Sequence, residues 1–156
     1  MKLRTLVTGT AGTAALAMGA LVTAPPALAV SPATATVQIN CEGGWPSGQA
    51  RLDVQQNGTT ATITFTTSVV WTSHSIPANS MNTTLTMSNA HGGTVTFKGT
   101  SNPAWTLPWQ PFNSGPLTGT VAPGDVLQAK SLTSTVGTLA INCTATSPQA
   151  PGPFVF

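Results

Sequence analysis

Charged side chains are scarce in this sequence, and tyrosine is absent. Lys and Arg together number 5 of the 156 residues, and Asp and Glu number 3. Two of the basic residues, Lys2 and Arg4, lie at the extreme N-terminus. Nucleic acid binding needs clustered Lys and Arg that replace counterions on phosphates, and binding to anionic lipid needs a polybasic patch. We therefore expect neither partner.

The N-terminus has the pattern of an export signal. The two basic residues precede an apolar run from Leu6 to Val22, and Ala27-Leu28-Ala29 places small residues at positions −3 and −1 of a cleavage site before Val30. We predict a cleaved signal peptide over residues 1–29, a mature domain over residues 30–156, and secretion to the extracellular space. No later apolar run approaches the roughly 20 residues that span a bilayer as a helix, so no stable membrane insertion is expected.

Groups that carry catalysis are equally few. A glycosidase needs two carboxylates that face each other across a cleft, and the three present here are far apart in the sequence. Ser73-His74-Ser75 is not accompanied by a Gly-x-Ser-x-Gly elbow, which leaves a small hydrolase as the weakest alternative. We predict a protein that is not an enzyme and uses no metal or cofactor. The carboxylates are Glu42, Asp53 and Asp125, and the histidines are His74 and His91.

The chain has two cysteines, Cys41 and Cys143. In an exported protein an even cysteine count at this level indicates a disulfide, with two free thiols or a metal site as the alternatives. Two thiolates alone make a poor zinc site, and neither histidine has a familiar ligand spacing to them. Both cysteines fall on the apolar face of a segment with strand periodicity. We predict a disulfide that joins the first strand to the last.

Alternation of apolar and polar residues dominates the mature chain. Asn57-Gly58 is a strong two-residue hairpin signal, and the segment from Thr60 to Thr67 alternates apolar residues with threonine. Turn signals recur about every eight to twelve residues, which is typical of an all-β domain. We predict a single antiparallel β-sandwich, immunoglobulin-like or a similar Greek key. A small closed β-barrel is the alternative.

The layout also resembles a known group of proteins. It combines the Ala-Leu-Ala leader, a first strand that ends in Cys41, a Thr-rich body punctuated by Pro and Gly, and a last strand that ends Ile141-Asn142-Cys143 before a Pro-Gly-Pro-Phe tail. In this it is similar to small secreted β-sandwich proteins of filamentous actinobacteria. The resemblance implies the fold and the compartment, and it assigns no catalytic or binding residue.

The tryptophans are the best candidates for a ligand site. Trp105 and Trp109 flank Thr-Leu-Pro in a proline-rich loop, and Trp45 lies in a loop between Gly and Pro. Aromatic faces suit the C–H faces of sugar rings or an apolar partner, and a stiff loop loses little entropy on binding. The alternative is that these side chains cap the core, and Trp71, which follows two valines, is predicted to be core.

From these observations we expect an extracellular binding protein. A polysaccharide or the cell wall is the first expected partner, with Trp105, Trp109 and Trp45 as its contacts. The alternative is a structural or protein-interaction role, in which the threonine-rich sheet surfaces contact an extracellular protein.

Overall fold

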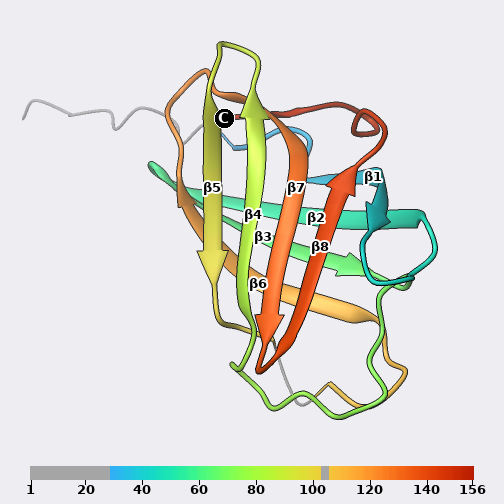
Figure 1. The fold of residues 1–156 in the computed structure, drawn as a ribbon. Coiled ribbons are helices and arrows are strands. Elements are labelled where there is room, and N and C mark those ends of the chain that lie inside the picture. The colour runs from blue at the N-terminus through green and yellow to red at the C-terminus, as the bar shows by residue number, and fades with distance from the viewer. Residues whose placement is uncertain (1–28, 103–105) are drawn as a thin grey trace, which may run out of the picture.

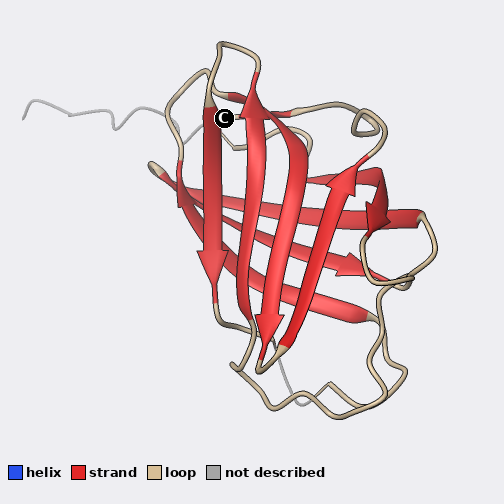
Figure 2. Cartoon of the chain, viewed as in Figure 1, coloured by secondary structure: helices blue, strands red, loops and turns tan. Residues whose placement is uncertain are grey.

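The computed structural model describes residues 29–102 and 106–156, and these residues form strands and loops (Figure 2). This confirms the all-β prediction. The predicted signal peptide lies outside the described residues except for Ala29. No helix long and apolar enough to cross a membrane is found in the part of the chain that was described. The strands are β1 (Thr34–Cys41), β2 (Gly48–Asn57), β3 (Thr60–Thr67), β4 (Asn82–Asn89), β5 (Thr94–Gly99), β6 (Phe112–Thr120), β7 (Val126–Val136), β8 (Leu139–Ala145) and β9 (Phe154–Val155).

Eight of the strands close into an antiparallel barrel. Their order is β4-β5-β6-β3-β2-β1-β8-β7, and β7 pairs back with β4. The short strand β9 pairs with the beginning of β7. In Figure 1, β4, β5, β7 and β8 run steeply across β1, β2, β3 and β6, which lie behind them. The strand pairing fits the closed barrel that the sequence left open as the second architecture, and the immunoglobulin-like sandwich is not confirmed.

The predicted hairpin is present between β2 and β3. Asn57 pairs with Thr60, and Gly58 adopts a φ of 60°, which glycine reaches without steric strain. The alternation in β3 also holds, because Ala61, Ile63 and Phe65 are buried and the threonines that alternate with them are half-buried. The strand ends at Thr67.

Two narrow seams close the barrel. Strands β1 and β8 share three register pairs, one of which is Cys41 with Cys143. These two residues form the predicted disulfide, with their Cα atoms 4.0 Å apart and a sequence separation of 102. Strands β5 and β6 share the single pair Lys98 and Thr118. A Cβ atom at Gly119 would lie 2.6 Å from the Phe97 ring, so glycine permits this close approach. Such pairings between distant strands do not change the alternation of apolar and polar residues along the sequence. The sequence therefore did not distinguish a barrel from a sandwich.

Side chains fill the interior of the barrel. Phe65, Phe97 and Leu52 are among the fully buried residues. The hollow bounded by Val37, Phe65 and Leu132 measures about 10 Å³, which is space for about one water molecule. A ligand larger than a water molecule does not fit this interior hollow.

The two ends of the barrel differ. At one end, here called the closed end, turns 90–93 and 122–125 meet the C-terminal residues 154–156. At the other end, here called the tryptophan end, loops 42–47 and 68–81 and the described residues of loop 100–111 (100–102 and 106–111) lie near the β7–β8 turn (Figure 1).

Candidate functional site

The two longest loops of the tryptophan end run side by side. They follow β3 and precede β6, and because these strands are hydrogen-bonded neighbours their loops leave the barrel together. The Phe112 N–H donates to the Val70 carbonyl at 3.2 Å, and the Trp109 N–H donates to the Thr72 carbonyl at 2.9 Å. The β3–β6 ladder is thus extended beyond the barrel wall.

Further hydrogen bonds fix the outer parts of these loops. Ile76 and Thr106 exchange reciprocal backbone hydrogen bonds of 2.8 and 2.9 Å. The Asn102 side chain is fully buried, and its Nδ2 donates to the Pro77 carbonyl at 3.0 Å while its Oδ1 accepts from the Ser80 N–H at 3.3 Å. A buried amide with satisfied partners holds the two loops in one geometry.

Two tryptophans on these loops form an exposed pair. The ring centroids of Trp71 and Trp109 are 4.5 Å apart, with 38° between the ring planes. The exposed fractions are 41% for Trp71 and 64% for Trp109. Five large hydrophobic side chains are exposed among the described residues, and all except Val155 lie at the tryptophan end. Exposed apolar side chains gathered in one region mark interaction sites more often than isolated ones do. The four are Trp71, Leu107, Trp109 and Leu139.

The backbone of Trp109 adopts a strained conformation. Its φ is 65°, in the left-handed region that bulky residues rarely occupy. This conformation costs about 1–2 kcal/mol for a residue with a Cβ atom. The hydrogen bond from its N–H to Thr72 helps to hold the residue there. Local backbone strain of this kind tends to cluster at functional sites.

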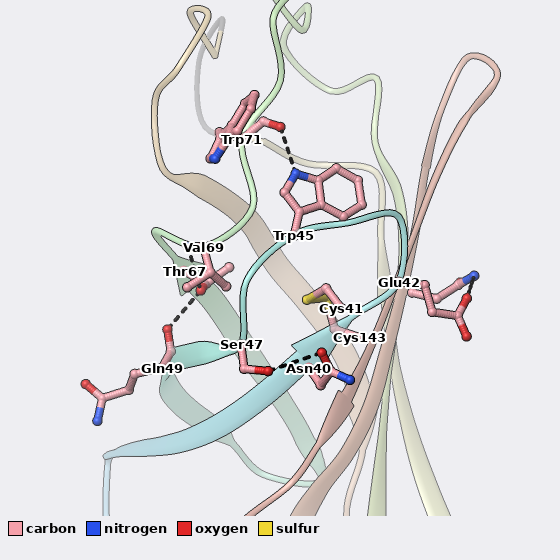
Figure 3. Close-up of a disulfide and its surroundings, with 11 residues drawn as sticks. Asn40, Cys41, Glu42, Trp45, Ser47, Gln49, Thr67, Val69, Trp71 and Cys143 are labelled. Carbon is pink, nitrogen blue, oxygen red and sulfur yellow. Dashed lines mark hydrogen bonds between the residues drawn. A yellow bond between two sulfur atoms is a disulfide. The ribbon is translucent and has the colours of Figure 1, made fainter.

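Trp45 joins the third loop to the same structure. Its ring is partly buried and packs against the core, and its Nε1–H donates to the Trp71 carbonyl at 3.2 Å (Figure 3). Loop 42–47 begins directly after Cys41, so the disulfide anchors its base to β8. Because the indole N–H already has a protein partner, Trp45 offers a ligand its ring and not its donor.

A groove of about 480 Å³ lies between these segments and the β7–β8 hairpin. Trp45 and Trp71 contribute aromatic surface, Ile76 and Leu139 contribute aliphatic surface, and hydroxyl groups and one imidazole complete the lining. None of these described lining residues is charged. They are Gly43, Trp45, Trp71, Thr72, Ser73, His74, Ser75, Ile76, Val136, Thr138 and Leu139.

The structure places the predicted tryptophans differently. Trp109 is exposed on its loop, and Trp45 is partly buried with its ring on the groove. Trp105 lies outside the described residues. The prediction that Trp71 is core is wrong. The alternation of β3 changes phase after Thr67, so that Val70 is buried and its neighbour Trp71 turns outward. The sequence does not reveal this change of phase, because Thr67 is polar and yet buried, and because Val69 and Val70 are both apolar.

The titratable groups lie apart from one another. The His74 ring contacts Ser73 Oγ through Nδ1 at 3.0 Å. Glu42 accepts a hydrogen bond from Asn142 at 3.0 Å, and its side chain points away from Trp45 (Figure 3). Asp125 is held in its turn by the Asn89 side chain at 2.7 Å. No group of three or more His, Cys, Asp or Glu that could hold a metal ion occurs among residues 29–102 and 106–156.

Asp53 lies on β2 and forms an ion pair with Arg51 at 2.7 Å. Hydrogen bonding from the Arg51 guanidinium lowers the pKa of Asp53 below its usual range, and Thr34 donates to the same carboxylate at 2.8 Å. Both partners are exposed and belong to the barrel wall.

The most distinctive surface in the described structure is therefore an uncharged aromatic one. It lies on loops that hydrogen bonds join at one end of the barrel. Its chemistry is that of binding through ring faces and hydroxyl groups. Comparisons with protein-family models, with curated proteins and with solved structures gave no match to this chain.

Proposed function

We propose that this protein is a secreted, non-catalytic binding domain that recognises an uncharged polysaccharide through its tryptophan end. The observation that carries the proposal is the exposed Trp71–Trp109 pair beside a groove that contains a third tryptophan. Exposed indoles are costly to leave in water, and a bound partner would remove that cost.

The electrostatics of the surface support an uncharged ligand. Residues that line the groove carry hydroxyl groups, one imidazole and apolar surface, with no charged side chain among those described. Sugar rings present C–H faces to aromatic rings and hydroxyl groups to polar side chains, so both halves of such a ligand find partners here. A charged polymer would find no ion-pair partner among the described residues that line the groove.

The rigidity of the loops supports binding in a fixed geometry. Backbone hydrogen bonds join loops 68–81 and 100–111, and Trp45 ties loop 42–47 to them. A surface that is ordered before binding loses less conformational entropy when the ligand arrives. The buried Cys41–Cys143 disulfide fits a protein that works in an oxidising, extracellular environment.

A second candidate function is binding to an extracellular protein. It is favoured by Leu107 and Leu139, which are exposed at the same end and add aliphatic surface. Tryptophans surrounded by smaller apolar contacts are typical of binding hot spots at protein interfaces.

Co-sedimentation of the purified protein with insoluble chitin, cellulose and peptidoglycan tests the proposal. The binding variant is Trp71→Ala/Trp109→Ala, and the matched control is Val155→Ala, which removes the exposed apolar side chain remote from the tryptophan end. We expect saturable binding that the double variant loses and the control keeps, with all three folded by circular dichroism. Absence of binding to all three polymers, or binding that survives in the double variant, would contradict the proposal.

A further inference from the structure

The groove and the exposed tryptophan pair share one residue. Trp71 lines the groove, and its ring also lies 4.5 Å from that of Trp109, which does not line it. The aromatic surface therefore extends from the groove across Trp71 to an outer ring that is 64% exposed. A ligand that filled the groove alone would leave Trp109 in water.

The groove and the pair offer different chemistry. The pair presents ring surface. The groove adds hydrogen-bonding groups, and the His74 imidazole is one of these. Its Nδ1 is engaged by Ser73 Oγ at 3.0 Å, and its main-chain oxygen accepts from Thr72 Oγ1 at 2.7 Å, so both the ring and the backbone are held.

The remaining ring nitrogen of His74 is available to a ligand. Nε2 has no hydrogen-bond partner within the described residues, and the side chain is exposed at the groove. An imidazole nitrogen can donate to or accept from a sugar hydroxyl, according to its tautomer. The groove therefore combines ring stacking with a directed hydrogen bond, and the outer pair supplies stacking alone.

We propose that the groove and the Trp71–Trp109 pair are two adjoining subsites for one uncharged, unbranched glycan chain, with Trp71 common to both. This inference rests on the function proposed above. The groove volume of about 480 Å³ lies within the range of about 300–1,000 Å³ that is usual for small-ligand sites. A short oligosaccharide fills the groove, and a longer one continues over Trp109.

Isothermal titration with chito- and cello-oligosaccharides of two to six units tests the two subsites. For the wild-type protein we expect the affinity to rise about five- to tenfold from the shortest chain to a chain of four units and then to stay constant, as one added aromatic contact predicts. Trp109→Ala should abolish this rise and keep the affinity for the disaccharide. His74→Ala should lower the affinity for every length by the same factor, about three- to tenfold for one hydrogen bond.

Three results would overturn the inference. The first is wild-type affinity that does not depend on chain length, and the second is an equal loss at every length in Trp109→Ala. The third is an absence of binding to any oligosaccharide when the protein still co-sediments with an insoluble polymer, which would leave the proposed function standing without these subsites. If the protein binds neither the oligosaccharides nor the polymers, the proposed function fails as well. Denaturant unfolding of each variant shows whether it remains folded.

Discussion

The two ends of this barrel differ in whether they leave aromatic side chains exposed. At the closed end, Phe154 and Phe156 are buried, and the main chain of Phe156 accepts from Gly124 at 2.7 Å and donates to Asp125 at 3.0 Å. At the tryptophan end, Trp71 and Trp109 remain exposed although hydrogen bonds also hold their backbones. The two ends therefore differ in the burial of these side chains, and hydrogen bonds order the backbone at both.

This contrast separates stability from function. A buried phenylalanine contributes to the free energy of folding through the apolar area it removes from water, about 25 cal/mol per Å². The indole of Trp109 contributes less because it is 64% exposed, and the left-handed backbone of this residue opposes folding. An ordered apolar surface that costs folding free energy is most simply explained by a binding role. We therefore assign the proposed function to the tryptophan end.

The largest effect on stability is expected from the disulfide, which joins β1 to β8 beside the tryptophan end. Replacing both cysteines, Cys41→Ala with Cys143→Ala, should lower the free energy of unfolding by about 4–5 kcal/mol on chain-entropy estimates for a loop of this length. Urea unfolding of the variant and of the oxidised wild type measures it. A reducing agent should destabilise the wild type and leave the variant unchanged. A loss under about 1 kcal/mol would contradict this view of the seam.

A substitution at each end tests the contrast directly. Phe154→Ala should lower the free energy of unfolding by about 3–5 kcal/mol, because it leaves a cavity in the core. Trp71→Ala removes a larger side chain but should lower it less, by about 1–3 kcal/mol, because Trp71 is 41% exposed and removes less of its apolar area from water. Chemical denaturation of both variants decides the point. Equal losses would show that Trp71 is part of the core.

Trp109 offers a smaller and more specific test. Because glycine accepts a φ of 65° without strain, Trp109→Gly should be more stable than Trp109→Ala, by up to about 1 kcal/mol. Leu107 is the matched control, since it is exposed on the same loop and is not among the residues with positive φ. There the glycine variant should be the less stable of the two. The same order at both positions would argue against strain at Trp109.

The smallest effect is expected from the Arg51–Asp53 ion pair on the barrel wall. Because the pKa of Asp53 is lowered in the folded protein, mainly by hydrogen bonding to Arg51, its stabilising contribution is present above the unfolded pKa and is lost as the pH falls through the folded pKa. Asp53→Asn should therefore be less stable than the wild type at pH 7, and the gap should narrow in acid. Urea unfolding across this pH range measures the gap, and a gap independent of pH would exclude the pair as its cause.

Local features of the fold were predictable from the sequence, and long-range closure was not. Asn57-Gly58 gave the β2–β3 hairpin because the turn needs positive φ, and the alternating segments gave the buried faces. The disulfide was predictable because the chain has two cysteines and both fall on the apolar face of a strand. The seam at Lys98 and Thr118 depends on Gly119, whose meaning appears only when Phe97 lies against it.

The candidate site shows the same division. Loop tryptophans at 45 and 109 could be identified from their Pro and Gly neighbours. Trp71 could not, because the phase of burial after Thr67 is set by the hydrogen bond between Phe112 and Val70, which are far apart in the sequence. His74 gave no signal beyond its type, since its place on the groove depends on three separate segments.

Two-dimensional NMR of the indole and backbone N–H groups, with and without a soluble oligosaccharide that the protein binds, tests the binding role of the tryptophan end most directly. The indole signals of Trp71 and Trp109, assigned through their alanine variants, should shift on titration. The amides of Gly124 and Phe156 at the closed end should stay in place. Shifts that centre on the closed end or on the threonine-rich walls, with the indole signals unchanged, would contradict the assignment of binding to the tryptophan end.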